Sequence, residues 1–130
     1  MAASPSPKSL AIVFLICQSV LTTVWWVGMS TVPQWRPLFF PMPHQDVGWS
    51  SYIFPDAVFY IAAGAIAAFG FLRGRRYAWP LLLVHAGAVG FAALHALAQA
   101  FITGRAWFGG LSMLASFVVV AWLAWRLQPE

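Results

Sequence analysis

Four long apolar runs dominate this chain of 130 residues and limit what it can fold into. They cover Leu10–Ser30, Pro55–Leu72, Ala78–Ile102 and Ala106–Trp125, close to the roughly 20 residues that a helix needs to cross a bilayer. Only helices and closed barrels can span lipid, and the runs lack the apolar–polar alternation of barrel strands. The sequence therefore predicts an all-α fold, a single domain in which four transmembrane helices form a bundle. The second run is the shortest and is expected to stand nearly upright.

Charge is scarce in this chain. Hydrophobic residues make up 62% and charged residues 8%, whereas about a quarter of the residues in soluble domains are charged. Most of the surface must therefore face membrane lipid. Nucleic-acid binding is not expected, because it needs a basic face in water. The first run is interpreted as a retained span, because it is long for a signal peptide and no small-residue cleavage site follows it.

The basic residues are divided unevenly between the two ends of the predicted bundle. Lys and Arg concentrate on the cytoplasmic side of membrane proteins. Five basic residues at the end with the termini, against two at the other end, predict that both termini lie in the cytoplasm (N-in/C-in). The membrane is expected to be a bacterial-type plasma membrane. The five are Lys8, Arg73, Arg75, Arg76 and Arg126, and the two are Arg36 and Arg105.

A loop of about two dozen residues joins the first two runs and is rich in proline and aromatic residues. Proline disfavours helix in the residue before it, so the loop is not expected to form a further span. It is too apolar to extend into water and is expected to fold over the outer mouth of the bundle. There it would act as an aromatic belt at the interface, as a lid over a pocket, or as both. Its rings are Trp35, Phe39, Phe40, Trp49, Tyr52 and Phe54.

Ionisable and polar groups within the runs are the candidates for function, because such groups are costly in a membrane. The 1.5 Å helical rise separates them into two layers about 15 Å apart. The outer layer holds Asp56, His95 and Gln99, and the inner layer holds His85 and Gln18.

The third run places small residues on the same face as these polar groups, which predicts that the face points into the bundle. The stripe is Ala88, Ala92, Ala96 and Ala100. In the fourth run, Ser112 and Ser116 are four residues apart and could pack against that face.

Asp56 has more than one interpretation. Pro55 and Asp56 resemble a helix start, with proline at the first position and an acid in the first turn. Alternatively, Asp56 pairs with His95 or Gln99 across the bundle. A loop partner such as Arg36 is the third possibility.

Redox and metal chemistry find little support in the sequence. Cys17 is the only cysteine, so no internal disulfide can form, and it is expected to be a small buried filler. His85 and His95 are too far apart along one helix to share a metal. A site made of His95, Asp56 and His44 is conceivable, but no spacing demands it. No metal and no cofactor is predicted.

These observations predict a small membrane protein that binds an apolar small molecule, such as an isoprenoid, a quinone or a lipid, in an outer-half pocket under the aromatic loop. The alternative is an isomerase or cyclase acting on such a ligand, with Asp56 and His95 as catalytic acid and base. A third interpretation is a homo-oligomer or an accessory subunit of a larger membrane complex or transporter. The predicted ligand-binding residues are Gln99, Trp25, Trp26, Trp49, Tyr52, Tyr60, Gln18 and His85.

Overall fold

A computed structural model describes residues 5–41 and 46–129, without the side chains of residues 46 and 47. Within these ranges the chain forms helices and short connections and contains no strand. Four helical spans are long and apolar enough to cross a membrane, which confirms the predicted helical class and number of spans. They are α1 (Pro7–Thr31), the composite span Gly48–Leu72, α6 (Ala78–Thr103) and α7 (Trp107–Arg126).

The second span is built from several helical segments. It runs through α3 (Asp46–Ser50), a turn, α4 (Ile53–Asp56), the π-helix η2 (Ala57–Ala62) and α5 (Ala63–Leu72).

The sequence placed the start of this span too late, at Pro55, and wrongly made it the shortest span. The span has 25 residues, whereas α7 has 20. The physical reason is that proline is tolerated throughout the first helical turn, where backbone N–H groups have no partner in any case. Helix α4 can therefore begin two residues before Pro55.

The π-helix η2 follows Asp56 directly. At its end the N–H of Ala63 bonds to the carbonyl of Val58, five residues earlier. Side chains from two other helices bond to carbonyls of this segment. Nδ1 of His85 lies 3.0 Å from the Phe59 oxygen, and the Ser19 hydroxyl lies 3.3 Å from the Ile61 oxygen. Polar backbone groups in lipid need partners within the protein, and these side chains supply them.

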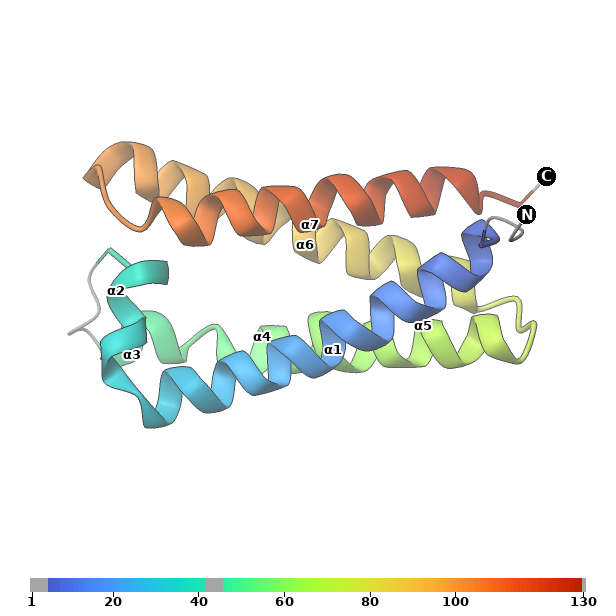
Figure 1. Ribbon diagram of the computed structural model, residues 1–130, viewed down its shortest axis with the longest axis horizontal. Helices are drawn as coiled ribbons and strands as arrows, with labels where there is room; N and C mark the ends of the chain where they lie inside the picture. The colour runs from blue at the N-terminus through green and yellow to red at the C-terminus, as the bar shows by residue number, and fades with distance from the viewer. Residues whose placement is uncertain (1–4, 42–45, 130) are drawn as a thin grey trace.

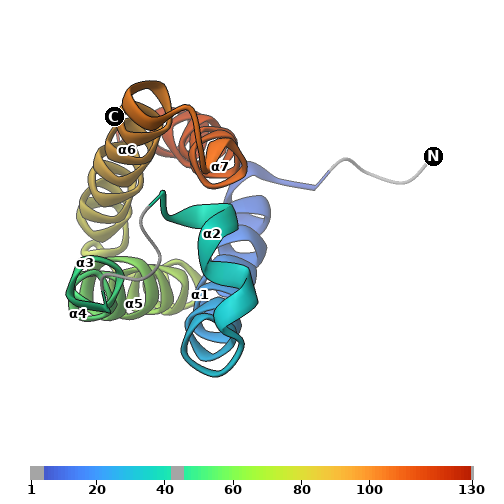
Figure 2. The same ribbon diagram turned by 90° about the vertical axis from the view of Figure 1, so that its left-hand side faces the viewer.

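The four spans form a ring in the order α1, α5, α6 and α7 (Figures 1 and 2). Helices adjacent in the chain pack along one another, whereas α1 and α7 close the ring with little contact. Figure 1 shows α1 beside α7 near the termini and diverging from it toward the other end. There the short helices η1 (Pro33–Trp35) and α2 (Arg36–Phe39) lie across the mouth of the ring (Figure 2).

Glycines bring α6 and α7 into close contact. A Cβ atom on Gly90 would lie 2.7 Å from the Phe117 ring, and one on Gly110 would lie 3.0 Å from Leu97. Such approach is how membrane helices pack in the absence of a hydrophobic driving force. The pairing of α6 and α7 is thus the firmest in the bundle, in contrast to the open seam between α7 and α1.

One expectation about this seam was wrong. Ser112 and Ser116, which could pack against the small-residue stripe of α6, line a groove between α7 and α1. Cys17 is exposed at the same groove and is not a buried filler. The reason is that cysteine is small and apolar, so its residue type does not reveal whether it faces lipid or the interior.

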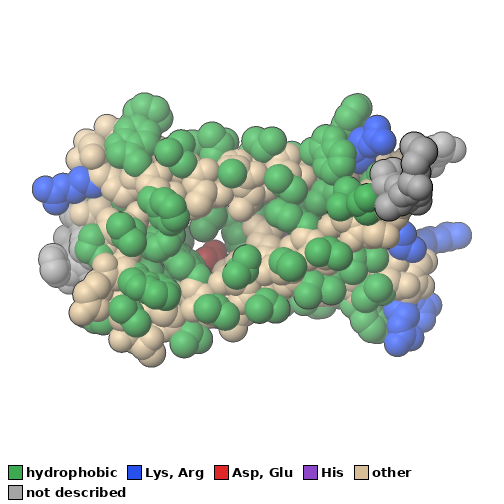
Figure 3. Space-filling view, viewed as in Figure 1, with side chains coloured by type: hydrophobic (Ala, Val, Ile, Leu, Met, Phe, Trp, Pro, Cys, Tyr) green, Lys and Arg blue, Asp and Glu red, His purple; other side chains and the backbone are tan. Residues whose placement is uncertain are grey.

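Basic side chains gather at the end of the bundle that holds both termini (Figure 3). The loop at residues 73–76, the start of α1 and the end of α7 all lie at this end (Figure 1).

Candidate functional site

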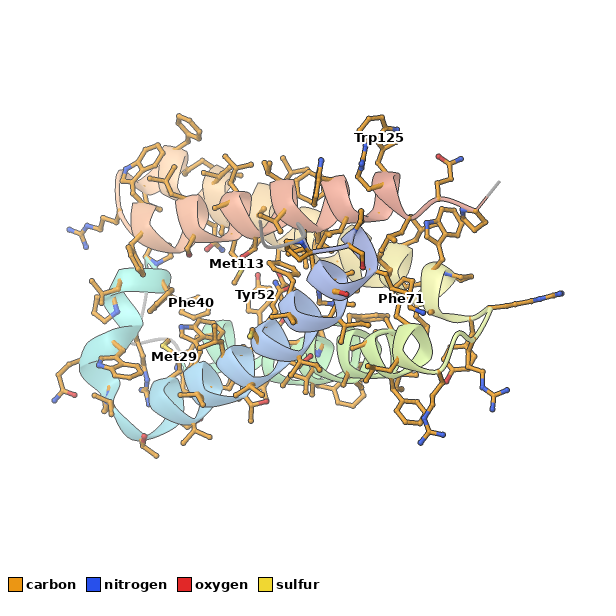
Figure 4. The ribbon with its side chains drawn as sticks, turned by 45° about the vertical axis from the view of Figure 1, so that its right-hand side comes forward. Met29, Phe40, Tyr52, Phe71, Met113 and Trp125 are labelled. Carbon is orange, nitrogen blue, oxygen red and sulfur yellow. The ribbon has the colours of Figure 1, made fainter. Side chains whose placement is uncertain are left out.

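A cavity of about 60 Å³ lies inside the half of the bundle beneath α2. One part of its wall is polar and the rest is aromatic or small. In Figure 4, Phe40, Tyr52 and Met113 lie toward this interior, whereas Trp125 points outward. The lining residues are Trp25, Phe39, Phe40, Tyr52, Asp56, Ala92, His95, Ala96, Gln99, Gly109 and Met113.

Asp56 is anchored by α1. The indole Nε1 of Trp26 donates a hydrogen bond to its carboxylate over 3.0 Å. Trp26 is buried and stacks on Trp49, with ring centroids 6.3 Å apart. Above Trp49 lies the guanidinium of Arg36, 4.3 Å from the ring centroid. The carboxylate is therefore held in place by a packed aromatic cluster that also involves the loop.

This contact differs from what the sequence suggested for Asp56. The residue is in the first turn of α4, but its own N–H already bonds to the Tyr52 carbonyl over 3.0 Å. It lies eight residues inside the span that begins at Gly48. Asp56 therefore does not mark the start of the span, and its carboxylate is turned inward to the cavity.

His95 is the centre of a second polar group on the cavity wall. The Tyr52 hydroxyl and the Gln99 side-chain nitrogen, the latter at 3.0 Å, both approach its Nε2 atom. An imidazole nitrogen has one in-plane position for a hydrogen bond, so the two partners compete for it. The ring of His95 also stacks on Phe91, with an interplanar angle of 11°. A ligand that engages either partner would leave the other with the histidine.

The inner layer forms a separate cluster around His85, which is fully buried. Because the Phe59 carbonyl can only accept, Nδ1 of His85 donates to it. Nε2 is then the acceptor, and the side-chain amide of Gln18, 2.9 Å away, donates to it with its NH2 group turned to the ring. A side chain at Gly64 would press on this cluster, since its Cβ would lie 3.1 Å from Ser19 Oγ and 3.3 Å from the histidine ring. The cluster fixes the π-helix and lies outside the cavity wall.

Trp25 borders the cavity and presents an unmet hydrogen-bonding group. Its Nε1 atom is buried and has no partner among the described residues. A buried donor without an acceptor costs about 1–3 kcal/mol, so this atom calls for an explanation.

Aromatic rings of α2 and the residue after it roof the cavity. Trp25 packs edge-on against Phe39 at 5.2 Å and stacks on Phe40 at 6.2 Å. Close to α7, the Phe39 backbone is 3.1 Å from where a Cβ on Gly109 would be. The glycine therefore lets α2 sit directly on α7 and close this side of the roof.

Two grooves on the sides of the bundle meet the cavity. One, of about 300 Å³, lies between α1 and α7 and shares Trp25, Phe39 and Met113 with the cavity wall. The other, of about 390 Å³, lies between the second span and α6 and shares Tyr52, Asp56 and Ala92. Figure 3 looks onto the first groove and shows a hollow with acidic colour at its base. Asp56 is the only acidic side chain among those the structure describes.

The structure brings five of the predicted residues to the cavity: Asp56, His95, Gln99, Trp25 and Tyr52. The other five lie apart from its wall. Trp26 and Trp49 pack behind Asp56, while Tyr60, Gln18 and His85 lie deeper, where the Tyr60 hydroxyl contacts the Met113 sulfur at 3.3 Å.

Sequence reasoning missed several contributors. Phe39 and Phe40 were taken as loop aromatics only, and Met113 and Ser19 were not considered. The sequence did contain a signal for the polar part of the cavity wall. Tyr52, Asp56 and Tyr60 recur every four residues in the second span, and this spacing is typical of one helix face. His44, proposed as a third metal ligand, lies outside the described residues.

Comparison with protein families, curated proteins and solved structures gives no match to this chain. The cavity wall offers a carboxylate, a phenol, an imidazole and an amide within an apolar, aromatic shell. Such a set can hold the polar end of an apolar molecule and can exchange protons with it.

Proposed function

We propose that this membrane protein binds an apolar small molecule, such as an isoprenoid, a quinone or a lipid, in its outer-half cavity. The observation that carries the proposal is the position of Asp56 and the Tyr52–His95–Gln99 group on the wall of one cavity under an aromatic roof. Ligand sites are usually apolar pockets with a few well-placed polar groups. Polar groups at membrane depth are costly and by default functional.

The Gln99 amide supports the same proposal, because its side-chain nitrogen carries two N–H groups on the cavity wall and only one is needed for His95, so the other can bond to a ligand oxygen atom. The grooves add a physical route, because both join the cavity to the lipid-facing surface. An apolar ligand dissolved in the bilayer would not need to pass through water.

A second candidate function is an acid–base isomerase or cyclase. It is favoured by a specific arrangement, in which a carboxyl group and a phenol–imidazole pair face one cavity from different helices. One of the two groups, Asp56 or the Tyr52–His95 pair, would donate a proton to the substrate, and the other would remove a proton from it, so that the substrate gains none overall. The faces of Trp25, Phe39 and Phe40 would stabilise a developing cation.

We also propose the orientation with both termini in the cytoplasm of a bacterial-type plasma membrane. The gathering of basic residues at the terminal end supports it through the positive-inside rule. In this orientation the cavity lies in the outer leaflet.

The test is mass spectrometry of small molecules that co-purify in mild detergent with the wild type and with variants. Asp56→Asn and His95→Leu change the cavity wall, and His85→Leu is the matched control in the inner cluster. We expect a specific molecule on the wild type and on the control, with at least a tenfold loss in the two cavity variants.

Generic lipid in equal amounts on all four folded proteins would refute the binding proposal and favour an accessory subunit. If the molecule is found, turnover separates the two candidates. An enzyme converts it and loses conversion in Asp56→Asn, whereas a binding protein leaves it unchanged.

A further inference from the structure

We propose that the ligand is a long-chain alcohol whose hydroxyl group sits in the cavity and whose chain leaves the bundle through the groove between α1 and α7. This inference rests on the proposed binding function and specifies the class of ligand and its access route.

The size of the cavity sets the first limit. Sites that enclose a whole drug-sized ligand measure about 300–1,000 Å³, whereas this cavity measures about 60 Å³. It has room for a small polar group and a few carbon atoms. The remainder of the ligand must lie in a connected space, which points to a narrow, flexible chain.

The chemistry of the wall selects the polar group. Asp56 is a hydrogen-bond acceptor held by Trp26, and the side-chain nitrogen of Gln99 on the same cavity wall carries two N–H donors. A hydroxyl group can donate to the first and accept from the second. An ionised fatty acid would place a second carboxylate beside Asp56 in an apolar space, where the two charges repel strongly. A hydrocarbon has no polar atom, so it would form no hydrogen bond with the acceptor or with the donor.

The groove between α1 and α7 is the route that the fold favours. It borders the cavity at Trp25, Phe39 and Met113 and holds about 300 Å³. The hollow in Figure 3 reaches from this face to an acidic side chain. The seam can also widen at low cost, because α1 and α7 make little contact, whereas η2 and α5 of the second span pack against α6. Widening the groove between the second span and α6 would break contacts between helices that already pack against each other.

The groove contains its own reporter, because Cys17 is the only cysteine in the sequence and lies exposed on the groove wall. The experiment follows alkylation of Cys17 by N-ethylmaleimide in lipid nanodiscs, using intact-protein mass spectrometry. The probes are octadecanol, octadecanoic acid and octadecane. We expect octadecanol to slow alkylation at least fivefold and the other two to change it less than twofold.

Bulky substitutions locate the route. Ser116→Trp fills the α1–α7 groove, and Ala115→Trp is its matched control at an exposed neighbouring position that does not line the groove. Ala88→Trp fills the groove beside α6. Because Ser116→Trp could itself shield Cys17, each variant is compared with its own alkylation rate without probe, and bound octadecanol is also counted after purification. We expect Ser116→Trp to lose octadecanol, and the other two variants to retain it.

Retention in Ser116→Trp together with loss in Ala88→Trp would overturn the proposed route. Equal protection by all three probes would overturn the alcohol head group, because the chain alone would then explain binding. If a native molecule co-purifies with the wild type but octadecanol gives no protection, this inference fails while the binding function stands. If no native molecule and no probe binds, the proposed function itself fails.

Discussion

Replacing His85 with leucine tests whether the π-helix depends on side chains for its stability. The side chain is fully buried and makes two interhelical hydrogen bonds, to the Phe59 carbonyl at 3.0 Å and to Gln18 at 2.9 Å. Leucine is of similar size but makes neither. An interhelical hydrogen bond in a membrane protein contributes about 0.6 kcal/mol on average and at most about 1.7 kcal/mol. His85→Leu should therefore lower the free energy of unfolding by about 1–3 kcal/mol.

Gln18→Leu is the matched variant, because it removes only the bond to Nε2 and should cost about half as much. The difference between the two variants isolates the bond to the Phe59 carbonyl. Both can be measured by titrating the folded protein in mild detergent with sodium dodecyl sulfate and following the fluorescence of its eight tryptophans. Equal stabilities for the two variants would refute the reasoning, since the carbonyl of the π-helix would then need no partner.

Two further variants probe packing and the anchor of Asp56. Gly90→Ala should lower the free energy of unfolding by about 1–3 kcal/mol in the same titration, because its Cβ would lie 2.7 Å from the Phe117 ring. Gly87→Ala is the control and should leave the free energy of unfolding nearly unchanged, because its Cβ would meet nothing within 4 Å. Trp26→Phe should cost about 1.5–3 kcal/mol through the lost hydrogen bond to the carboxylate. That cost should shrink by at least half in an Asp56→Asn background, and an undiminished cost would mean that only the packing of the indole matters.

The four spans could be predicted because long apolar runs have few other stable solutions in a membrane. The start of the second span could not be placed. Residues 46–54 mix aromatic, polar and small side chains, and no periodic pattern separates a loop from a helix there. The π-helix had no signal either, because Ala57–Ala62 resembles any apolar helical segment.

The grouping of polar residues in depth follows from the helical rise alone, and so His95 with Gln99 and His85 with Gln18 were placed in the correct layers. Partners across helices were harder to predict. The bond from Trp26 to Asp56 depends on how α1 is rotated about its own axis. Gln18 and Ser19 mark the side of α1 that faces the bundle, but they do not show which of the adjacent rings, Trp25 or Trp26, reaches Asp56.

The wide turn at Ala57–Ala62 also determines how this chain tolerates a change in length. A π turn holds one residue more than an α turn, so deleting one residue there would let regular α-helical bonding continue from α4 into α5. Because the extra residue is accommodated within that one turn, its deletion would leave the faces of α4 and α5 in the same rotational relation. The same deletion inside α5, a regular α-helix, would instead rotate the part of the span before it by about 100°, and Asp56 with it. We therefore expect the chain to tolerate the loss of one residue at Ala57–Ala62 with its site intact, and to lose the site when the residue is removed from α5.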